Sequence, residues 1–335
     1  MSEYSEDFVI QDGILEKYTG RDSHVVIPDS VTSIGDFAFC GCSSLTDIQV
    51  ADNNGYYKGI DGSLYTKDGK TLIKYACGSG SVSFKIPDGV TSIDYGAFEA
   101  CRSLTHITIP DSVTSIGKNA FRDCESLTHI SIPDRVTSIG SDTFHGCKSL
   151  TYITIPDSVT CIGKAAFRGC ASLTSITIPD SVTSIGEDAF YGCASLTHIT
   201  IPDSVTSIGD FAFYGCKSLT HITIPDSVTS IGDYAFCGCE SMTHITIPDS
   251  VTSIGDSAFE VCTNLTHITI PDSVTCIGKE AFLCCESLTS ITIPDSVTSI
   301  GEDAFCGCEI TIHAHSGTDA EKYARENSIS FEEIK

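Results

Sequence analysis

Apolar side chains recur along this chain at a fixed distance of 23 residues, a period far longer than that of any single helix or strand. One unit, residues 103–124, reads SLTHITIPDSVTSIGKNAFRDC, and near-copies of it follow one another. Such a period is typical of a solenoid, in which a coil buries its apolar face only when another coil stacks on it. The pattern therefore predicts one repeat array that is mainly β, in place of several ordinary domains.

The order of residues within one unit predicts how each coil is built. Residues 104–109 follow the pattern Leu-x-x-Ile-x-Ile, which indicates a half-buried strand. Pro110 cannot donate to a sheet ladder and so ends that strand in a turn. Residues 113–116 predict a second short strand with Val113 and Ile116 directed inward. Residues 120–124 place Ala, Phe and Cys at the spacing of one turn of helix on the core.

The boundaries of the array follow from where the repeat fails. Two Asp-Gly turns between alternating apolar runs predict a β-hairpin inserted in one coil. A capping box at Thr318–Glu321 predicts a short helix near the C-terminus. We expect a single, complete domain of residues 1–335 with five segments: an N-terminal cap at 1–22, a first repeat at 23–50, a repeat with the hairpin insertion at 51–83, regular 23-residue repeats at 84–308, and a C-terminal cap at 309–335.

Cysteine is unusually frequent, and most of it follows the repeat. Of the 18 cysteines, eleven lie 14 residues after the proline of their unit. A residue type fixed at one place in every coil indicates a packing position, where a free cysteine acts as a small buried hydrophobe. We therefore predict reduced, structural thiols at Cys42, Cys101, Cys124, Cys147, Cys170, Cys193, Cys216, Cys239, Cys262, Cys285 and Cys308. The recurring Cys-Gly-Cys has neither zinc-knuckle nor redox-motif spacing.

Charge narrows the range of partners. The chain carries 44 Asp and Glu against 19 Lys and Arg, a net charge of −25. Such a surface repels phosphate backbones and anionic lipid, so we expect no nucleic-acid partner and favour a basic one. No apolar run is long enough to span a bilayer, and the N-terminus lacks the basic and apolar regions of a signal peptide. We expect no membrane insertion, and the missing signal and many thiols favour a cytoplasmic location.

The consensus L-x-x-I-x-I-P-x-x-V-x-x-I-G-x-x-A-F-x-x-C resembles the BspA-like class of leucine-rich repeat, over roughly residues 8–335. Departures are small: Asp94 replaces the glycine, Thr143 the alanine and Met242 the strand leucine. The resemblance implies a right-handed, curved leucine-rich-repeat solenoid with a parallel sheet on its concave side. It also implies a protein-binding or adhesion module without enzymatic activity, and a cell-surface or secreted location as the alternative to the cytoplasm.

Histidine forms the most suggestive row of polar residues. Stacked parallel strands would place these side chains about 4.8 Å apart, beside a row of threonines. One interpretation is a face that contacts a partner, and the other is a metal-binding or pH-sensing stripe. A single line of ligands does not easily supply tetrahedral geometry, so we assign no metal ligands. The rows contain His106, His129, His198, His221, His244 and His267, with Thr200, Thr223 and Thr246.

Aromatic residues gather at the positions where the repeats differ most. Tyr191 and Tyr214 follow the conserved phenylalanine of their units, and Phe211 and Tyr234 lie two residues after the glycine. We predict that these four side chains form one patch on the turn side of the coils, with the composition of an interface. The alternative is drift at unconstrained surface positions.

Catalysis is disfavoured by the symmetry of the repeat. An active site needs unlike groups that converge at one place, whereas Ser, His, Asp and Thr recur here at equal spacing. We predict no catalytic residues, no cofactor and no enzyme.

The first hypothesis is a non-enzymatic protein-interaction or adhesion module with a protein partner. The alternatives are a metal- or pH-responsive module based on the histidines and, more weakly, a carbohydrate-binding adhesin. Partner identity and oligomeric state stay open.

Overall fold

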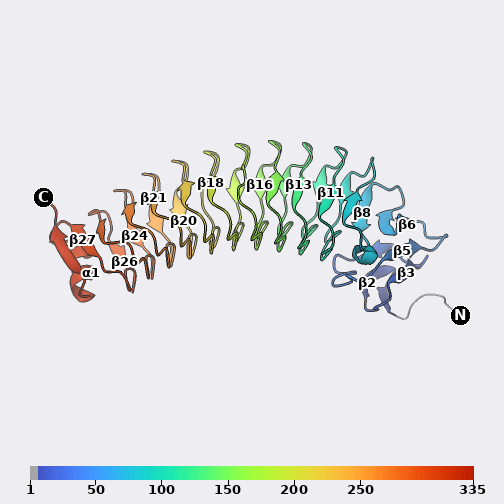
Figure 1. Cartoon of the computed structure of the whole chain (residues 1–335), viewed down its shortest axis with the longest axis horizontal. Helices are drawn as coiled ribbons and strands as arrows, with labels where there is room; N and C mark the ends of the chain where they lie inside the picture. The colour runs from blue at the N-terminus through green and yellow to red at the C-terminus, as the bar shows by residue number, and fades with distance from the viewer. Residues whose placement is uncertain (1–6) are drawn as a thin grey trace. The chain divides into compact units, whose positions relative to one another are not determined.

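The computed structural model describes residues 7–335, and these form two compact units, the first ending at Val159 and the second beginning at Thr160. Residues 1–6, where the expected N-terminal cap begins, lie outside the described residues. Each unit is built from short strands, most of them parallel and paired with the equivalent strand of the next coil (Figure 1). The prediction of a mainly β solenoid with parallel sheets is therefore confirmed.

The first unit contains fifteen strands and one short 3-10 helix among its described residues. These are β1 (Phe8–Gln11), β2 (Ile14–Tyr18), β3 (His24–Ile27), β4 (Ser33–Ile34), β5 (Asp47–Val50), β6 (Tyr57–Ile60), β7 (Ser63–Thr66), β8 (Thr71–Lys74), η1 (Cys77–Ser79), β9 (Ser83–Lys85), β10 (Ser92–Ile93), β11 (His106–Thr108), β12 (Ser115–Ile116), β13 (His129–Ser131), β14 (Ser138–Ile139) and β15 (Tyr152–Thr154).

The second unit contains thirteen strands and an α-helix. These are β16 (Cys161–Ile162), β17 (Ser184–Ile185), β18 (His198–Thr200), β19 (His221–Thr223), β20 (Ser230–Ile231), β21 (His244–Thr246), β22 (Ser253–Ile254), β23 (His267–Thr269), β24 (Cys276–Ile277), β25 (Ser290–Thr292), β26 (Ser299–Ile300), β27 (Thr311–Ala314), α1 (Asp319–Glu326) and β28 (Ser330–Glu333).

Parallel pairing at the repeat period places like residues opposite one another. In the first unit β9, β11, β13 and β15 form one sheet, and His106 lies opposite His129. In the second unit β20, β22, β24 and β26 form another, with Ile254 opposite Ile277. The register follows from burial, because a shift by one residue would turn every core isoleucine to solvent.

Residues 51–83 depart from this arrangement in the first unit. There β6 pairs with β7 and β7 pairs with β8, both antiparallel, before β8 rejoins the parallel sheet beside β10. The side chains of Ser63, Leu64 and Tyr65 are all buried, although they are consecutive. A strand whose side chains are buried on both faces has other parts of the chain packed on both sides. The meander is therefore part of the core of the first unit.

A column of phenylalanine rings runs through the core of the second unit. Successive rings are stacked with centroids 5.3–5.4 Å apart and nearly parallel planes. Each ring is at most 1 % exposed and fills the space between two neighbours. The column consists of Phe167, Phe190, Phe213, Phe236, Phe259, Phe282 and Phe305.

The segment expected to form a turn of helix is instead a run of tight turns. The Tyr214 N–H donates within its own coil to the Phe211 carbonyl, whereas the N–H groups of Phe213 and Gly215 donate to the next coil. Phe211 and Gly215 have φ values of +56° and +66°, in the left-handed region, and these residues interrupt what would otherwise be a helical turn. Among the described residues α1 is the one α-helix, and the Thr318 hydroxyl caps it as predicted.

We expect Phe213→Ala to destabilise the second unit by about 3–5 kcal/mol, because the substitution leaves a cavity between two stacked rings. Phe213→Leu keeps most of the volume and should lose roughly half as much. Urea unfolding followed by circular dichroism measures both, with Thr223→Ala on the exposed sheet face as the control. Equal midpoints for Phe213→Ala and Thr223→Ala would contradict this role for the ring column.

Candidate interaction surface

The predicted histidine and threonine rows lie on the exposed face of the parallel sheets. In β18 and β19, His198 lies opposite His221 and Thr200 lies opposite Thr223. These four side chains are exposed, whereas the isoleucine between each pair is buried, because side chains alternate along a strand. In β21 and β23 the side chains of His244, His267 and Thr246 are likewise exposed, whereas β11 and β13 place the half-buried His106 opposite the exposed His129.

Neighbouring imidazoles are close enough to contact each other. The ring centroids of His221 and His244 are 5.4 Å apart, and those of His106 and His129 are 4.6 Å apart. Each unit therefore contains a pair of neighbouring imidazoles that nearly touch.

Where a threonine hydroxyl contacts both a backbone carbonyl of the preceding coil and an imidazole, it determines the tautomer of that ring. Thr197 Oγ1 donates its single proton to the Thr174 carbonyl at 3.2 Å and lies 3.0 Å from His198 Nδ1. The oxygen can therefore only accept from the ring, so Nδ1 carries the proton and a neutral ring leaves the Nε2 lone pair unprotonated. Thr128 holds His129 in the same way.

The four predicted aromatic residues come together in the second unit, and we call Tyr191, Phe211, Tyr214 and Tyr234 the aromatic cluster. Tyr191 stacks on Tyr214 with centroids 4.6 Å apart, and Phe211 stacks on Tyr234 at 4.8 Å. Phe211 and Tyr214, at 6.1 Å, join the two pairs. All four are half-buried on the turn segment of the coils, whereas the predicted histidines and threonines lie on the sheet face. The predicted site residues therefore form two separate sets.

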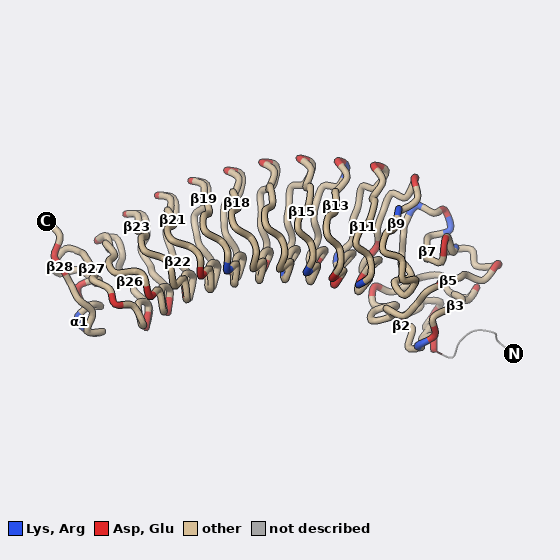
Figure 2. Tube along the Cα trace, in the orientation of Figure 1, with Lys and Arg blue, Asp and Glu red and all other residues tan. Residues whose placement is uncertain are grey.

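A cation and a row of carboxylates border the aromatic cluster. The Arg168 guanidinium lies 4.1 Å above the Tyr191 ring and 3.0 Å from the Asp188 carboxylate. Asp210 accepts a hydrogen bond from the Asp233 N–H at 2.9 Å, and Asp233 accepts one from the Asp256 N–H at 2.8 Å. These acidic positions repeat from coil to coil beside the cluster. Figure 2 shows Asp and Glu recurring along the turns of successive coils.

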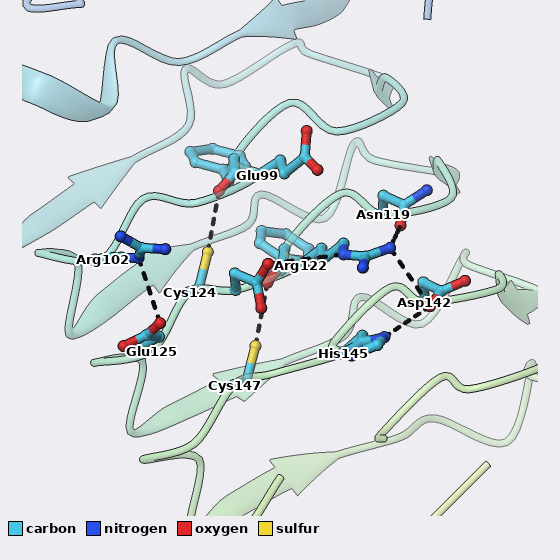
Figure 3. A network of polar contacts seen from close by, with 12 residues as sticks. Glu99, Arg102, Asn119, Arg122, Cys124, Glu125, Asp142, His145 and Cys147 are labelled. Atoms are coloured by element: carbon cyan, nitrogen blue, oxygen red, sulfur yellow. Dashed lines mark hydrogen bonds and ion pairs between the residues drawn. The ribbon is translucent and has the colours of Figure 1, made fainter. Parts of the chain in front are cut away.

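The repeated cysteine has a polar partner that the sequence reading missed. Cys124 Sγ donates to the Phe98 carbonyl at 3.1 Å, and Cys147 does the same to Phe121, as Figure 3 shows. In the second unit Cys216 donates to Phe190 at 3.3 Å. Burial raises the pKa of the Cys124 and Cys216 thiols to about 12, so both stay protonated donors.

One repeated cysteine corrects the prediction of reduced thiols throughout. Cys101 forms a disulfide with Cys77, and their Cα atoms are 4.6 Å apart. The irregular coil explains this: Tyr75 replaces the phenylalanine and stacks on Phe98 at 5.3 Å, which brings Cys77 against the next coil. The prediction that all the repeated cysteines are free is wrong at Cys101.

Lys74 is a second residue that sequence reasoning missed. It is 5 % exposed at the end of β8, and Nζ donates to the carbonyls of Gly96 at 2.9 Å and Glu99 at 3.4 Å. Burial lowers the pKa of this amine from 10.5. The alternation of buried side chains along β8 could have indicated this burial, because Lys74 lies two residues after the buried Leu72 and therefore on the same face of the strand.

Neither a metal centre nor a membrane-spanning helix is present in the part of the chain that the structure describes. No three His, Cys, Asp or Glu side chains of residues 7–335 are grouped so that they could hold an ion. Over the same residues, no helix has both the length and the apolar character needed to cross a bilayer. A cavity of about 500 Å³ beside α1, lined by Phe305, Cys306 and Tyr323 among others, contains none of the predicted site residues.

Comparison with known proteins places these features in a family. A model described as BspA type leucine rich repeat region, in six copies, matches residues 17–61, 74–197 and 183–311. A leucine-rich repeat protein from Bacteroides ovatus is 27 % identical, with 83 % of this chain and 98 % of that chain covered and a TM-score of 0.57. A leucine rich cell surface protein from Faecalibacterium prausnitzii is 30 % identical, with 98 % and 97 % covered and a TM-score of 0.57. A search of curated proteins found no match.

The thiol geometry predicts a selective pattern of alkylation. At pH 8 a thiol with a pKa of about 12 is ionised in only about one molecule in 10⁴, so Cys124 and Cys216 should stay unmodified by iodoacetamide in the folded protein. The exposed Cys40 and Cys306 should react. Peptide mapping by mass spectrometry measures each site, and urea-denatured protein is the control. Comparable rates at Cys216 and Cys306 in the folded protein would contradict the burial.

Lys74→Met should stabilise the first unit at neutral pH by about 1–3 kcal/mol, because the substitution removes a buried amine that has no counter-ion. Since the folded pKa lies below 10.5, the unfolded chain binds more protons between the two values, and wild-type stability rises with pH across that window. The difference between variant and wild type should therefore shrink from pH 7 to pH 10. Urea unfolding at several pH values tests this, and a constant difference would contradict it.

Proposed function

The chain belongs to the BspA-type leucine-rich repeat family, and from this we propose that it is a non-enzymatic module that binds a protein partner on its exposed repeat surface. The observation that carries the proposal is the in-register sheet face, on which adjacent coils present the same exposed pair over a fully packed core. A surface of this kind offers many equivalent contacts and is already rigid before binding, so little ordering is needed on association. We further propose that residues 1–335 act as a single repeat domain.

The two predicted sets of residues have different roles in this proposal. The histidine and threonine rows supply repeated hydrogen-bonding groups along the sheet face. The aromatic cluster supplies the anchor, because tyrosine and arginine are the residues on which interface energy concentrates. Phe211 and Tyr214 are half-buried and each stacks on another ring of the cluster, so they contact a partner without first losing side-chain freedom.

Charge supports a basic partner surface. The chain carries −25, and carboxylates repeat beside the aromatic cluster. Complementary charge accelerates association and excludes acidic partners, and this effect weakens as salt rises. Binding through this surface should therefore show a salt-dependent on-rate.

A second function, pH-responsive binding, is favoured by the imidazole tautomers. The neutral rings of His198 and His129 present Nε2 as an acceptor, and protonation would convert that atom into a donor and add positive charge. Because His221 and His244 lie 5.4 Å apart, acid would place charges on adjacent rungs. A partner that donates to the neutral rings would lose those hydrogen bonds when the rings are protonated.

The test is affinity capture with the purified chain as bait, followed by measured affinities for each captured protein. We expect Tyr214→Ala combined with Tyr234→Ala to weaken binding at least tenfold, since hot-spot truncations remove about 2 kcal/mol or more. His221→Ala combined with His244→Ala tests the sheet face at pH 7.5 and 5.5. Ser299→Ala, exposed and outside both sets, is the matched control.

Two outcomes would count against the proposal. The first is that no protein partner is recovered under native conditions at low salt. The second is that partners are recovered, but both double variants bind them as tightly as the Ser299→Ala control. Retention by a glycan array in place of protein would favour an adhesin that binds carbohydrate.

A further inference from the structure

Hydrogen bonds between the turn segments of the second unit form continuous chains that run from coil to coil in one direction. The Phe259 N–H donates to the Ala281 carbonyl at 2.8 Å. The Phe282 N–H, which belongs to the same peptide group as that carbonyl, donates in turn to the Ala304 carbonyl at 2.8 Å. This relation holds at the phenylalanine of every coil from 167 to 282, and two further chains run two residues before it and two residues after it. Three columns of peptide groups therefore cross the unit with all their N–H groups directed toward the C-terminal coil.

The three columns end without an acceptor carbonyl at the last coil. The next donors would be the N–H groups of Asp303, Phe305 and Gly307, and no carbonyl of residues 7–335 accepts a hydrogen bond from them. Asp303 is exposed, whereas Ser257, its equivalent two coils earlier, is buried. Aligned peptide dipoles add, as they do at the N-terminus of a helix, so this edge carries a partial positive charge that attracts acceptor oxygens.

The cavity of about 500 Å³ beside α1 lies against this edge. Its lining combines Asp303, Phe305 and Gly307 from the last coil with Tyr323 and residues 327–330 from the C-terminal cap, which Figure 1 shows at the end of the unit. A volume of this size is within the roughly 300–1,000 Å³ of small-molecule sites. The unpaired N–H groups therefore border a space that a ligand can enter.

Tyr323 extends the central column into this cavity. Its side chain is only 8 % exposed. Burial raises the pKa of Tyr323, and the N–H groups of Phe305 and Ala304 act in the opposite direction, so the phenolic oxygen faces the end of the column. The Tyr323 carbonyl accepts from the Asn327 amide, but no group of residues 7–335 accepts the hydroxyl proton. Tyr323 is therefore placed to donate this proton to a ligand.

Two carboxylates decide which kind of acceptor fits the cavity. Asp303 and Glu309 line it, and both are exposed. They repel a free anion, although the N–H groups alone would attract one. A neutral carbonyl meets no such repulsion, and a cationic side chain on the same molecule would pair with the carboxylates. A peptide that contains lysine or arginine offers both groups.

We propose that this cavity binds a short basic peptide segment of a partner protein. One carbonyl oxygen of the peptide accepts from the Gly307 N–H, and another accepts from the Tyr323 hydroxyl. Neighbouring columns are served by carbonyls two residues apart, as those of Ala281 and Leu283 are, so three residues of peptide are enough for both bonds. A lysine or arginine of the segment pairs with Glu309. Main-chain hydrogen bonds then give affinity and the basic side chain gives specificity, as in strand addition to a sheet edge.

This site is separate from the binding surface proposed above. None of the histidines, threonines or aromatic residues assigned to that surface lines the cavity. Peptide binding at the last coil therefore stands or falls independently of the aromatic cluster and the sheet face.

The test is an NMR titration of the full-length chain, labelled with ¹⁵N at phenylalanine and glycine, with a Gly-Lys-Gly peptide that is acetylated and amidated at its ends. We expect the Gly307 amide signal to shift in a saturable way, and the Phe305 signal to shift with it. The Gly238 and Phe282 signals are matched controls, because their N–H groups already donate to the next coil at 2.7 and 2.8 Å. A Gly-Glu-Gly peptide with the same end groups, and sodium acetate, should shift none of the four signals.

Substitutions test the groups that hold the peptide. Tyr323→Phe removes one hydrogen bond and should weaken binding of the basic peptide about two- to tenfold. Glu309→Gln should also weaken binding and reduce its dependence on salt. Tyr152→Phe, at an exposed tyrosine of the first unit, is the matched control. Unchanged Gly238 and Phe282 signals show that a variant keeps its stacked coils.

Three results would overturn the proposal. The first is the absence of a saturable shift at Gly307 with the basic peptide. The second is an equal shift with acetate, which would make this a site for simple anions. The third is equal affinity of Tyr323→Phe and Tyr152→Phe for the basic peptide, which would leave the hydroxyl without a role in binding.

Discussion

The stacking of each coil on a neighbouring coil of nearly the same sequence is the interaction on which the rest of this structure depends. A phenylalanine stacks on the equivalent phenylalanine, and a strand isoleucine pairs with the equivalent isoleucine. Since each residue meets a copy of itself, one sequence position decides both sides of a contact. This explains why the strand positions keep their register from coil to coil, because a shift by one residue within a strand would turn its buried side chains to solvent.

The same constraint gives the cysteine its role. Stacking two turns brings a phenylalanine carbonyl to the inner surface, and the thiol of the next coil donates to it, as Cys216 does to Phe190. A buried carbonyl benefits from a second donor, and a thiol supplies one in a space that is otherwise apolar. Packing and hydrogen bonding therefore select the same small residue at this position.

Departures from the repeat are where unlike groups meet. The meander of residues 51–83 stacks Tyr75 on Phe98, pairs Cys77 with Cys101 and buries Lys74. The regular repeats single out no coil, whereas this one coil differs from the others in its disulfide and its buried lysine. The aromatic cluster has a similar origin, because it arises where the turn residues of neighbouring coils differ from the consensus.

By itself the sequence determined the solenoid, its parallel strands, the rows of His198 and Thr200, and the helix capped by Thr318. These depend on periodicity and local capping, which are properties of residues close together in the chain. The tertiary structure alone decided the left-handed turn at Phe211, the disulfide of Cys101 and the buried amine of Lys74. Each of these depends on which groups of a neighbouring coil lie opposite. A hydrophobic pattern does not indicate in which direction that coil places its N–H groups and its thiol, or where it leaves free volume.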